Sequence, residues 1–189
     1  MKPIFMMPKF RLSAYFWLAL LAATALLCGC QAKPAPLSPG AANFKHEIEA
    51  CLKNFSAALM EPLVNKDVAA INAALKKVES PAVKLCSLCP FQVGVMNRIG
   101  EILATYPPRS KNNGKNYSNY DLVAKAISSK KIQQQRFYLQ NGSELFIICA
   151  PLLRGDNLIG LVAIAVNSKD AAQKWDLTEK EFLSINFNT

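Results

Sequence analysis

The segment 132–166 constrains the fold most, because it predicts three consecutive antiparallel strands joined by two tight turns. Asn141-Gly142 predicts a type I′ first turn, since both residue types tolerate the positive φ that its two central positions require. Residues 154–157 (RGDN) predict the second turn. The second and third strands are apolar on both faces, whereas a half-exposed strand would alternate apolar with polar residues. We therefore expect a sheet that is covered on both sides.

The N-terminus predicts a secretory signal peptide over residues 1–29. Lysines and an arginine precede an apolar run over residues 12–27, which is shorter than the roughly 20 residues of a membrane span. Without the three signal-peptide cations, 19 basic residues face 13 acidic ones, so the mature chain carries a net charge of +6. A moderate positive charge is ordinary beside an anionic membrane, and no aromatic–basic interleaving predicts a nucleic-acid partner.

The residues that follow this run, LCGC at positions 27–30, resemble the bacterial lipoprotein lipobox (Leu, a small residue, Gly, then Cys). The resemblance implies lipidation at Cys30 and a lipid anchor on the periplasmic side of a bacterial membrane, in the cell envelope. Cys28 is a departure, because Ala or Ser is commoner there. Gln31 in place of Asp resembles the enterobacterial pattern for outer-membrane sorting. An uncleaved N-terminal anchor helix is the alternative, and it too would tether the domain outside the cytoplasm.

The rest of the chain predicts a Pro-rich linker over residues 30–42 and a single domain over residues 43–189. Asn43 can cap a helix that carries an apolar stripe at 3.6-residue spacing and stops before Pro62. A second helix is expected over residues 66–78.

A hairpin is expected next, with strands over residues 91–97 and 101–106, whereas residues 83–89 fit a strand or a loop. A long polar loop follows over residues 107–118, of the kind that often forms a lid. Ser118 and Asp121 resemble a capping box that opens a short helix, and a second capping box, Thr178 with Glu181, begins a helical turn near the C-terminus.

This order of elements resembles the extracytoplasmic Cache (PDC) sensor domain of the broad PAS-like fold. The resemblance rests on residues 93–106 (VGVMNRIGEILATY) and 144–166, where an apolar strand ends near Pro151, turns at Gly155 and continues into a strand with Gly160. GAF-like domains share this architecture. The resemblance implies an α+β fold with an antiparallel sheet of about five strands. Long N-terminal helices would cover one face, and the lid loop and short helix the other.

The same resemblance implies that a small molecule binds between the sheet and the lid. Membrane-spanning members continue into a second transmembrane helix and an output module, whereas this sequence ends at Thr189, so signalling is expected to need a partner protein. The candidate ligand-binding residues are Tyr106 and Tyr120, which flank the lid, and Arg136 and Tyr138, which share one face of a strand. Arginine can grip a carboxylate through two hydrogen bonds. The alternative is that Arg136 faces solvent and the tyrosines are ordinary sheet residues.

Four cysteines remain in the expected mature domain: Cys51, Cys86, Cys89 and Cys149. Export makes disulfides the default, and four cysteines allow three pairings. Cys86 and Cys89 form a CxxC motif, but Pro90 follows at once and no βαβ unit surrounds it, which disfavours a redox centre. All four thiolates together could hold zinc.

No catalytic motif is visible, and His46 is the only histidine, so we expect no enzyme, no cofactor and no metal. Three hypotheses follow. The first is a membrane-anchored sensor domain that binds a small molecule, with a carboxylate as a candidate. The second is a structural or partner-docking lipoprotein that keeps the fold but has lost its pocket. The third, a metal or redox protein that uses Cys86 and Cys89, has the least support.

Overall fold

The structure is a computed structural model that describes residues 36–188 apart from positions 79, 81, 83, 89 and 90. Leu37–Thr189 form one compact unit. The predicted signal peptide, Cys30 and most of the linker lie outside the described residues, as does Cys89. No helix among the described residues is both long and apolar enough to span a bilayer.

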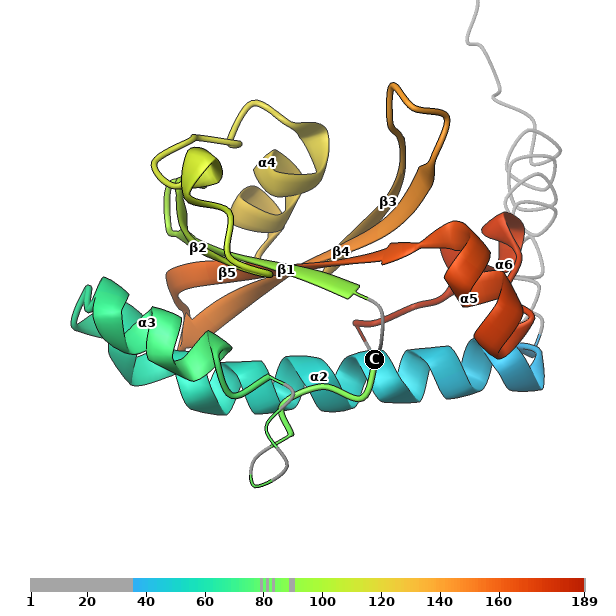
Figure 1. Cartoon of the computed structure of the whole chain (residues 1–189), viewed down its shortest axis with the longest axis horizontal. Helices are drawn as coiled ribbons and strands as arrows, with labels where there is room; N and C mark the ends of the chain where they lie inside the picture. The colour runs from blue at the N-terminus through green and yellow to red at the C-terminus, as the bar shows by residue number, and fades with distance from the viewer. Residues whose placement is uncertain (1–35, 79, 81, 83, 89–90, 189) are drawn as a thin grey trace, which may run out of the picture. The chain divides into compact units, whose positions relative to one another are not determined.

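Five antiparallel strands form a single sheet in the order β2-β1-β5-β4-β3 (Figure 1). Their bounds are β1 Phe91–Asn97, β2 Ile102–Tyr106, β3 Gln133–Tyr138, β4 Glu144–Arg154 and β5 Asn157–Asn167. The predicted hairpin and three-stranded meander are confirmed. The last strand pairs with the first, from Phe91 opposite Val166 to Asn97 opposite Gly160, so the meander and the hairpin share one sheet. The described residues of the segment 83–89 contain no strand.

The first meander turn differs from the expected type I′ turn, because only Gly142 has a positive φ, of 77°. The Leu139 N–H donates to the Ser143 carbonyl at 2.8 Å, and the Gly142 N–H donates to the Leu139 carbonyl at 2.9 Å. The loop is therefore longer than two residues, and glycine alone takes the left-handed position. At the second turn, Arg154 pairs directly with Asn157 across a two-residue loop, in which Gly155 has a φ of 58°.

One face of the sheet is covered by α2 (Pro39–Val64), which runs along it (Figure 1). The helix begins earlier than the predicted cap at Asn43, because the Ser38 hydroxyl accepts the Ala41 N–H at 3.2 Å and Pro39 fits the first helical position. Residues 39–42 thus belong to the helix and not to the linker. The helix also continues past Pro62 to Val64, so the predicted end before Pro62 is wrong.

The main core lies between α2 and this face. Phe44, Ile48, Phe55 and Leu59 of α2 are fully buried. Strand residues of the same cluster include Phe91, Val95, Phe146, Ile148 and Ile164. Glycine at position 160 permits close packing, because a Cβ there would lie 2.6 Å from the Met96 carbonyl oxygen and 3.1 Å from the Leu63 side chain.

Three shorter helices complete this layer: α3 (Val68–Leu75), α5 (Ser168–Trp175) and α6 (Glu179–Ser184). The predicted capping box of Thr178 and Glu181 is present at the start of α6. Phe182 of α6 stacks on Phe146 with ring centroids 4.3 Å apart. Phe44 meets Trp175 edge-to-face at 5.2 Å, so the C-terminal helices pack against the first half of α2.

The opposite face is covered by α4 (Asp121–Ser129) and by the loop before it, which includes the 3₁₀ turn η1 (Ser110–Asn112). Coverage of both sheet faces, expected from the apolar strands, is therefore confirmed. The predicted Ser118 capping box is wrong, because the cap position of α4 is Tyr120, which makes no side-chain cap hydrogen bond. Leu122, Val123 and Ala126 of α4 pack against the sheet in a second cluster.

Candidate functional site

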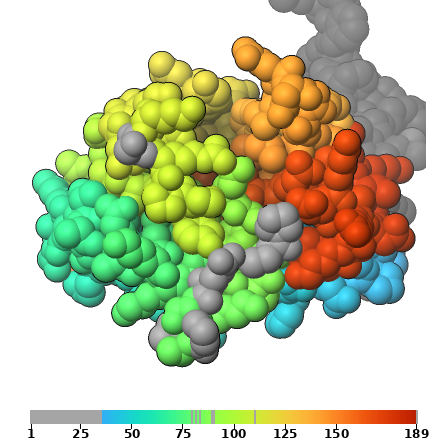
Figure 2. Space-filling model, in the orientation of Figure 1, coloured from blue at the N-terminus to red at the C-terminus, as the bar shows by residue number. Residues whose placement is uncertain are grey.

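The lid side of the sheet contains a cavity of about 280 Å³, which we call the lid-side cavity. Figure 2 shows the surface hollowed between the lid loop with α4 and the β3–β4 hairpin. Its lining residues come from all five strands, the lid loop and α4: Gln92, Val93, Gly94, Met96, Ile102, Thr105, Tyr106, Pro107, Arg109, Asn112, Tyr117, Tyr120, Leu122, Val123, Phe137, Leu139, Leu145, Ile147, Ala163 and Ala165.

Small side chains explain why this face is hollow. Gly94 of β1 lies opposite Ala163 of β5, and Ala165 follows two residues later on the same face. α4 packs farther along the sheet, against a cluster that includes Met96, Cys149 and Leu161. The glycine and the two alanines therefore form a floor that no large side chain fills.

The walls are apolar and the rim is polar. Phe137, Leu145 and Ile147 of the β3–β4 hairpin line one side. On the lid side, Thr105 Oγ1 accepts the Arg109 N–H at 2.9 Å and donates to the Pro107 carbonyl at 3.2 Å, which holds the start of the lid against β2. An apolar cavity with a few placed polar groups is the usual form of a small-molecule site.

Two predicted site residues line the lid-side cavity. Tyr106, at the end of β2, packs near Phe91 with ring centroids 5.8 Å apart. Tyr120 lies 51% exposed before α4, with its ring 5.3 Å from that of Tyr117. Their binding of a ligand stays a prediction.

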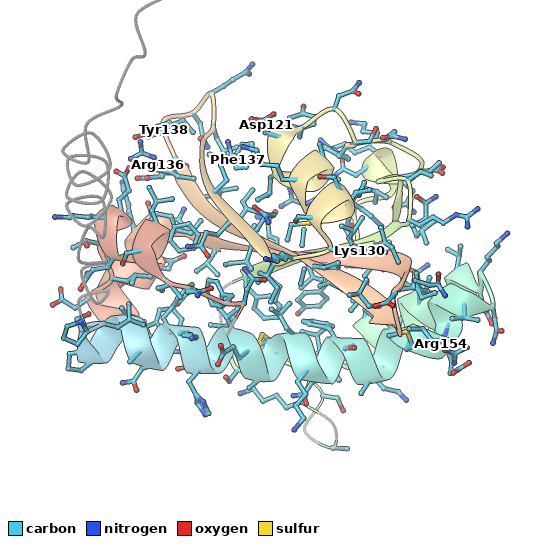
Figure 3. The ribbon with its side chains drawn as sticks, turned by 180° about the vertical axis from the view of Figure 1, so that it is seen from behind. Asp121, Lys130, Arg136, Phe137, Tyr138 and Arg154 are labelled. Carbon is cyan, nitrogen blue, oxygen red and sulfur yellow. A yellow bond between two sulfur atoms is a disulfide. The ribbon has the colours of Figure 1, made fainter. Side chains whose placement is uncertain are left out.

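The other two predicted residues, Arg136 and Tyr138, point away from the cavity (Figure 3). Arg136 forms ion pairs with Glu144, at 3.4 Å, and with Glu179 of α6, and its guanidinium lies 4.6 Å from the centre of the Tyr138 ring. The choice of face was wrong, because strand residues alternate and Phe137 is the one that lines the cavity. The alternative of a solvent-facing Arg136 does not hold either, since its side chain is only 27% exposed.

Arg109 lines the cavity but is absent from the predicted set of site residues. It is the only charged residue among those that line the cavity in the described part of the chain. Two signals could have found the site: the run of small residues on one face of β5, and an arginine at the start of a lid. Alternation along the strand puts Phe137 on the face opposite Arg136, but nothing in the sequence shows which face α2 covers.

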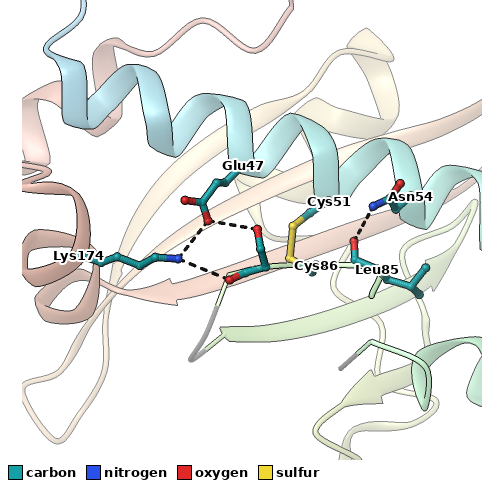
Figure 4. Close-up of a disulfide and its surroundings, with 7 residues drawn as sticks. Glu47, Cys51, Asn54, Leu85, Cys86 and Lys174 are labelled. Atoms are coloured by element: carbon teal, nitrogen blue, oxygen red, sulfur yellow. Dashed lines mark hydrogen bonds and ion pairs between the residues drawn. A yellow bond between two sulfur atoms is a disulfide. The ribbon is translucent and has the colours of Figure 1, made fainter. Parts of the chain in front are cut away.

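The cysteine hypotheses are resolved by a disulfide between Cys51 of α2 and Cys86 (Figure 4). Because Cys51 and Cys86 are bonded to each other, the alternatives of a four-cysteine zinc site and of a Cys86–Cys89 redox pair do not hold. Among the described residues, no cluster of His, Cys, Asp or Glu side chains could hold a metal ion. Cys149 is a buried free thiol, and burial raises its pKa to about 12.

Polar contacts surround the disulfide and tie the segment before β1 to the helices (Figure 4). Asn54 of α2 donates to the Leu85 carbonyl at 3.1 Å. Glu47 accepts a hydrogen bond from Ser87 at 3.2 Å and pairs with Lys174 of α5 at 3.0 Å. His46 is exposed on α2 and takes no part in these contacts.

Comparison with known proteins supports the fold through structure alone. No protein-family model matches the sequence, and no curated protein matches it. The structure is similar to a domain of a sensory box/GGDEF family protein from Vibrio parahaemolyticus, with a TM-score of 0.56 and 14% identity over 89% of this chain and 65% of that one.

It is also similar to the ligand-binding domain of the Pseudomonas fluorescens chemoreceptor CtaA. The TM-score is 0.52 at 15% identity, both for the complex with L-isoleucine and for the complex with L-alanine. Each likeness covers 71% of this chain, and 55% and 58% of the respective solved chains. The chain thus spans less than two thirds of each of these structures. Its fold is the PAS/Cache-like fold of sensor domains.

Proposed function

We propose that this chain is an extracytoplasmic sensor domain that binds a small molecule in the lid-side cavity. The observation that carries the proposal is the hollow itself, floored by Gly94, Ala163 and Ala165 where a structural domain would place larger side chains. The CtaA domain, which shares the fold, is solved with two amino acids bound, L-isoleucine and L-alanine. Ligand binding between sheet and lid is the use of this fold that the cavity supports best.

A thermal-shift screen against a broad metabolite library tests this role. The wild-type protein should gain thermal stability with one chemical class of ligand, because a ligand that binds only the folded state stabilises it. Ala163→Leu fills the floor and should lose the shift, whereas Ala42→Leu, at an exposed position of α2, should keep it. The proposal fails if no ligand acts on the wild type, or if the Ala163→Leu protein, folded by circular dichroism, responds equally.

The proposal includes a lipid tether at Cys30 and a partner protein that receives the signal. The tether rests on the lipobox-like sequence behind a signal peptide. Cys30→Ser should release the protein from the membrane fraction and remove the acyl mass from its N-terminal peptide. A Cys30→Ser protein that stays in the membrane would contradict the tether and favour an uncleaved anchor helix.

No catalytic step is part of the proposal, since the only histidine is exposed on α2 and lies outside the cavity lining. A docking lipoprotein without a ligand is the second candidate. A sheet with side chains packed tightly on both faces would favour that function. The lid-side cavity is evidence against it.

A further inference from the structure

We propose that the ligand is an apolar monocarboxylate without an ammonium group, whose carboxylate binds Arg109. This inference rests on the proposed small-molecule role of the lid-side cavity and specifies the chemistry of that same site. It departs from the amino acids bound in the CtaA complexes. Three features of the cavity support the inference: the single cation and the lack of a carboxylate among its described lining residues, and its apolar walls.

Arg109, in the lid loop, differs from the two arginines on the strands. Arg136 is paired with two glutamates and Arg154 with Glu61, whereas no described acidic residue forms an ion pair with Arg109. Its backbone N–H donates to Thr105 Oγ1 at 2.9 Å, which fixes the backbone of this exposed residue at the rim of the cavity. From this position its guanidinium can bind a carboxylate through two parallel hydrogen bonds.

No aspartate or glutamate is among the described lining residues. The two acidic residues nearest in sequence are engaged elsewhere: Asp121 pairs with Lys125 at 3.6 Å, and Glu101 accepts a hydrogen bond from Asn97 at 2.9 Å. An ammonium group next to the carboxylate would therefore lie beside the like charge of Arg109, with no lining counter-charge to offset it. A second carboxylate on the ligand would likewise lack a cation.

The remaining surface suits a hydrocarbon body. Phe137, Leu145 and Ile147 form the hairpin wall above the floor of Gly94, Ala163 and Ala165. A volume of about 280 Å³ is near the lower end of ligand pockets, which begin at roughly 300 Å³. The geometry thus accommodates a short aliphatic or aromatic acid better than an extended polar metabolite.

Isothermal titration calorimetry on the full-length protein in detergent tests the inference with matched triplets. Each triplet contains a monocarboxylate, its α-amino derivative and its alcohol: 4-methylpentanoate with leucine and 4-methylpentanol, and 3-phenylpropanoate with phenylalanine and 3-phenylpropanol. The carboxylate should bind at least about tenfold more tightly than either relative, because the amine places an ammonium beside the like charge of Arg109 and the alcohol loses the charge-assisted hydrogen bond, each at about that cost.

Arg109→Gln should weaken carboxylate binding by about tenfold or more and leave alcohol binding unchanged, because only the charged contact is removed. The control is Lys111→Gln, which removes an exposed cation of the same lid outside the lining residues and should bind as the wild type does.

Equal or tighter binding of the amino acids, or no effect of Arg109→Gln, would overturn the inference and leave the small-molecule role intact. If neither the triplets nor the metabolite screen gives any binding, the proposed function itself fails, and this inference fails with it.

Discussion

Cys149 is the residue whose environment most directly limits its chemistry. It lies on β4 beneath α4, fully buried, and burial raises the pKa of its thiol from 9.0 to about 12. The thiol is therefore neutral and inaccessible in the folded protein at neutral pH. Because the folded state holds this proton more tightly, its contribution to stability is complete below pH 9 and is lost as the pH rises towards 12.

We predict that iodoacetamide does not label Cys149 in the native protein at pH 8 and labels it readily in urea. Site-resolved mass spectrometry of the labelled peptides makes the measurement. Labelling of native Cys149 at the rate seen in urea would show that the thiol is exposed, and α4 would then not cover it.

At the residue scale, sequence alternation predicts which side chains of a strand share a face. It does not predict which face the helices cover and which face lines the cavity. Arg136 and Tyr138 share one face of β3, as predicted, and Phe137 lies on the other face. Only the position of α2 and α6 decides that Arg136 meets Glu179 while Phe137 lines the cavity. Arg109 escaped notice because a charged residue in a polar loop has no periodic partner.

At the scale of elements, the start of α2 is tied to the start of α6 through Glu181. Hydrogen bonds from the Ser38 hydroxyl and from the backbone and hydroxyl of Thr178 lower the pKa of the Glu181 carboxyl from 4.5 to about 2. These bonds favour the carboxylate, so their contribution to stability is present above pH 4.5 and is lost as the pH falls towards 2.

We predict that the thermal midpoint of Glu181→Gln falls less steeply than that of the wild type between pH 4.5 and 2. Ser38→Ala, which removes the largest of these interactions, should give an intermediate slope. Calorimetry across this pH range makes the comparison. Identical slopes in all three proteins would show that the junction between α2 and α6 is not linked to this carboxyl.

The disulfide joins α2 to the segment before β1 across a sequence separation of 35 residues. Closing a loop of that length lowers the entropy of the unfolded chain and should stabilise the fold by about 4 kcal/mol. Cys86→Ser should therefore lower the free energy of unfolding in urea by this order, and reduction of the wild type should act similarly. An unchanged urea midpoint after verified reduction would contradict the prediction.

Most elements could be predicted from the sequence, because apolar periodicity and turn residues report local structure. The predictions are wrong where a contact distant in sequence decides where a helix begins or which cysteines pair. α2 starts at Pro39, and position 40 in its first turn requires glycine, because a Cβ there would lie 1.7 Å from the Trp175 carbonyl oxygen. The disulfide pairing depends in the same way on how α2 lies against the segment before β1.

At the scale of the whole domain, the two faces of the sheet are built differently. The α2 face holds the larger core of aromatic and aliphatic side chains, including the stacked Phe146 and Phe182. A cavity of about 510 Å³ lies at its far end, beside Leu63 and Ile159. The lid face has a smaller cluster beside a cavity. We interpret this asymmetry as a rigid support on one side and a binding surface on the other.

The central claim is that a small molecule occupies the lid-side cavity. Native mass spectrometry of the wild type and of Ala165→Phe, purified side by side from the same cells, tests it most directly. We predict a bound species of small-molecule mass on the wild type, retained or restored by a monocarboxylate, and none on the variant, whose aromatic ring fills the cavity. The same species bound equally to both proteins, or no species on the wild type even with added ligand, would contradict the account.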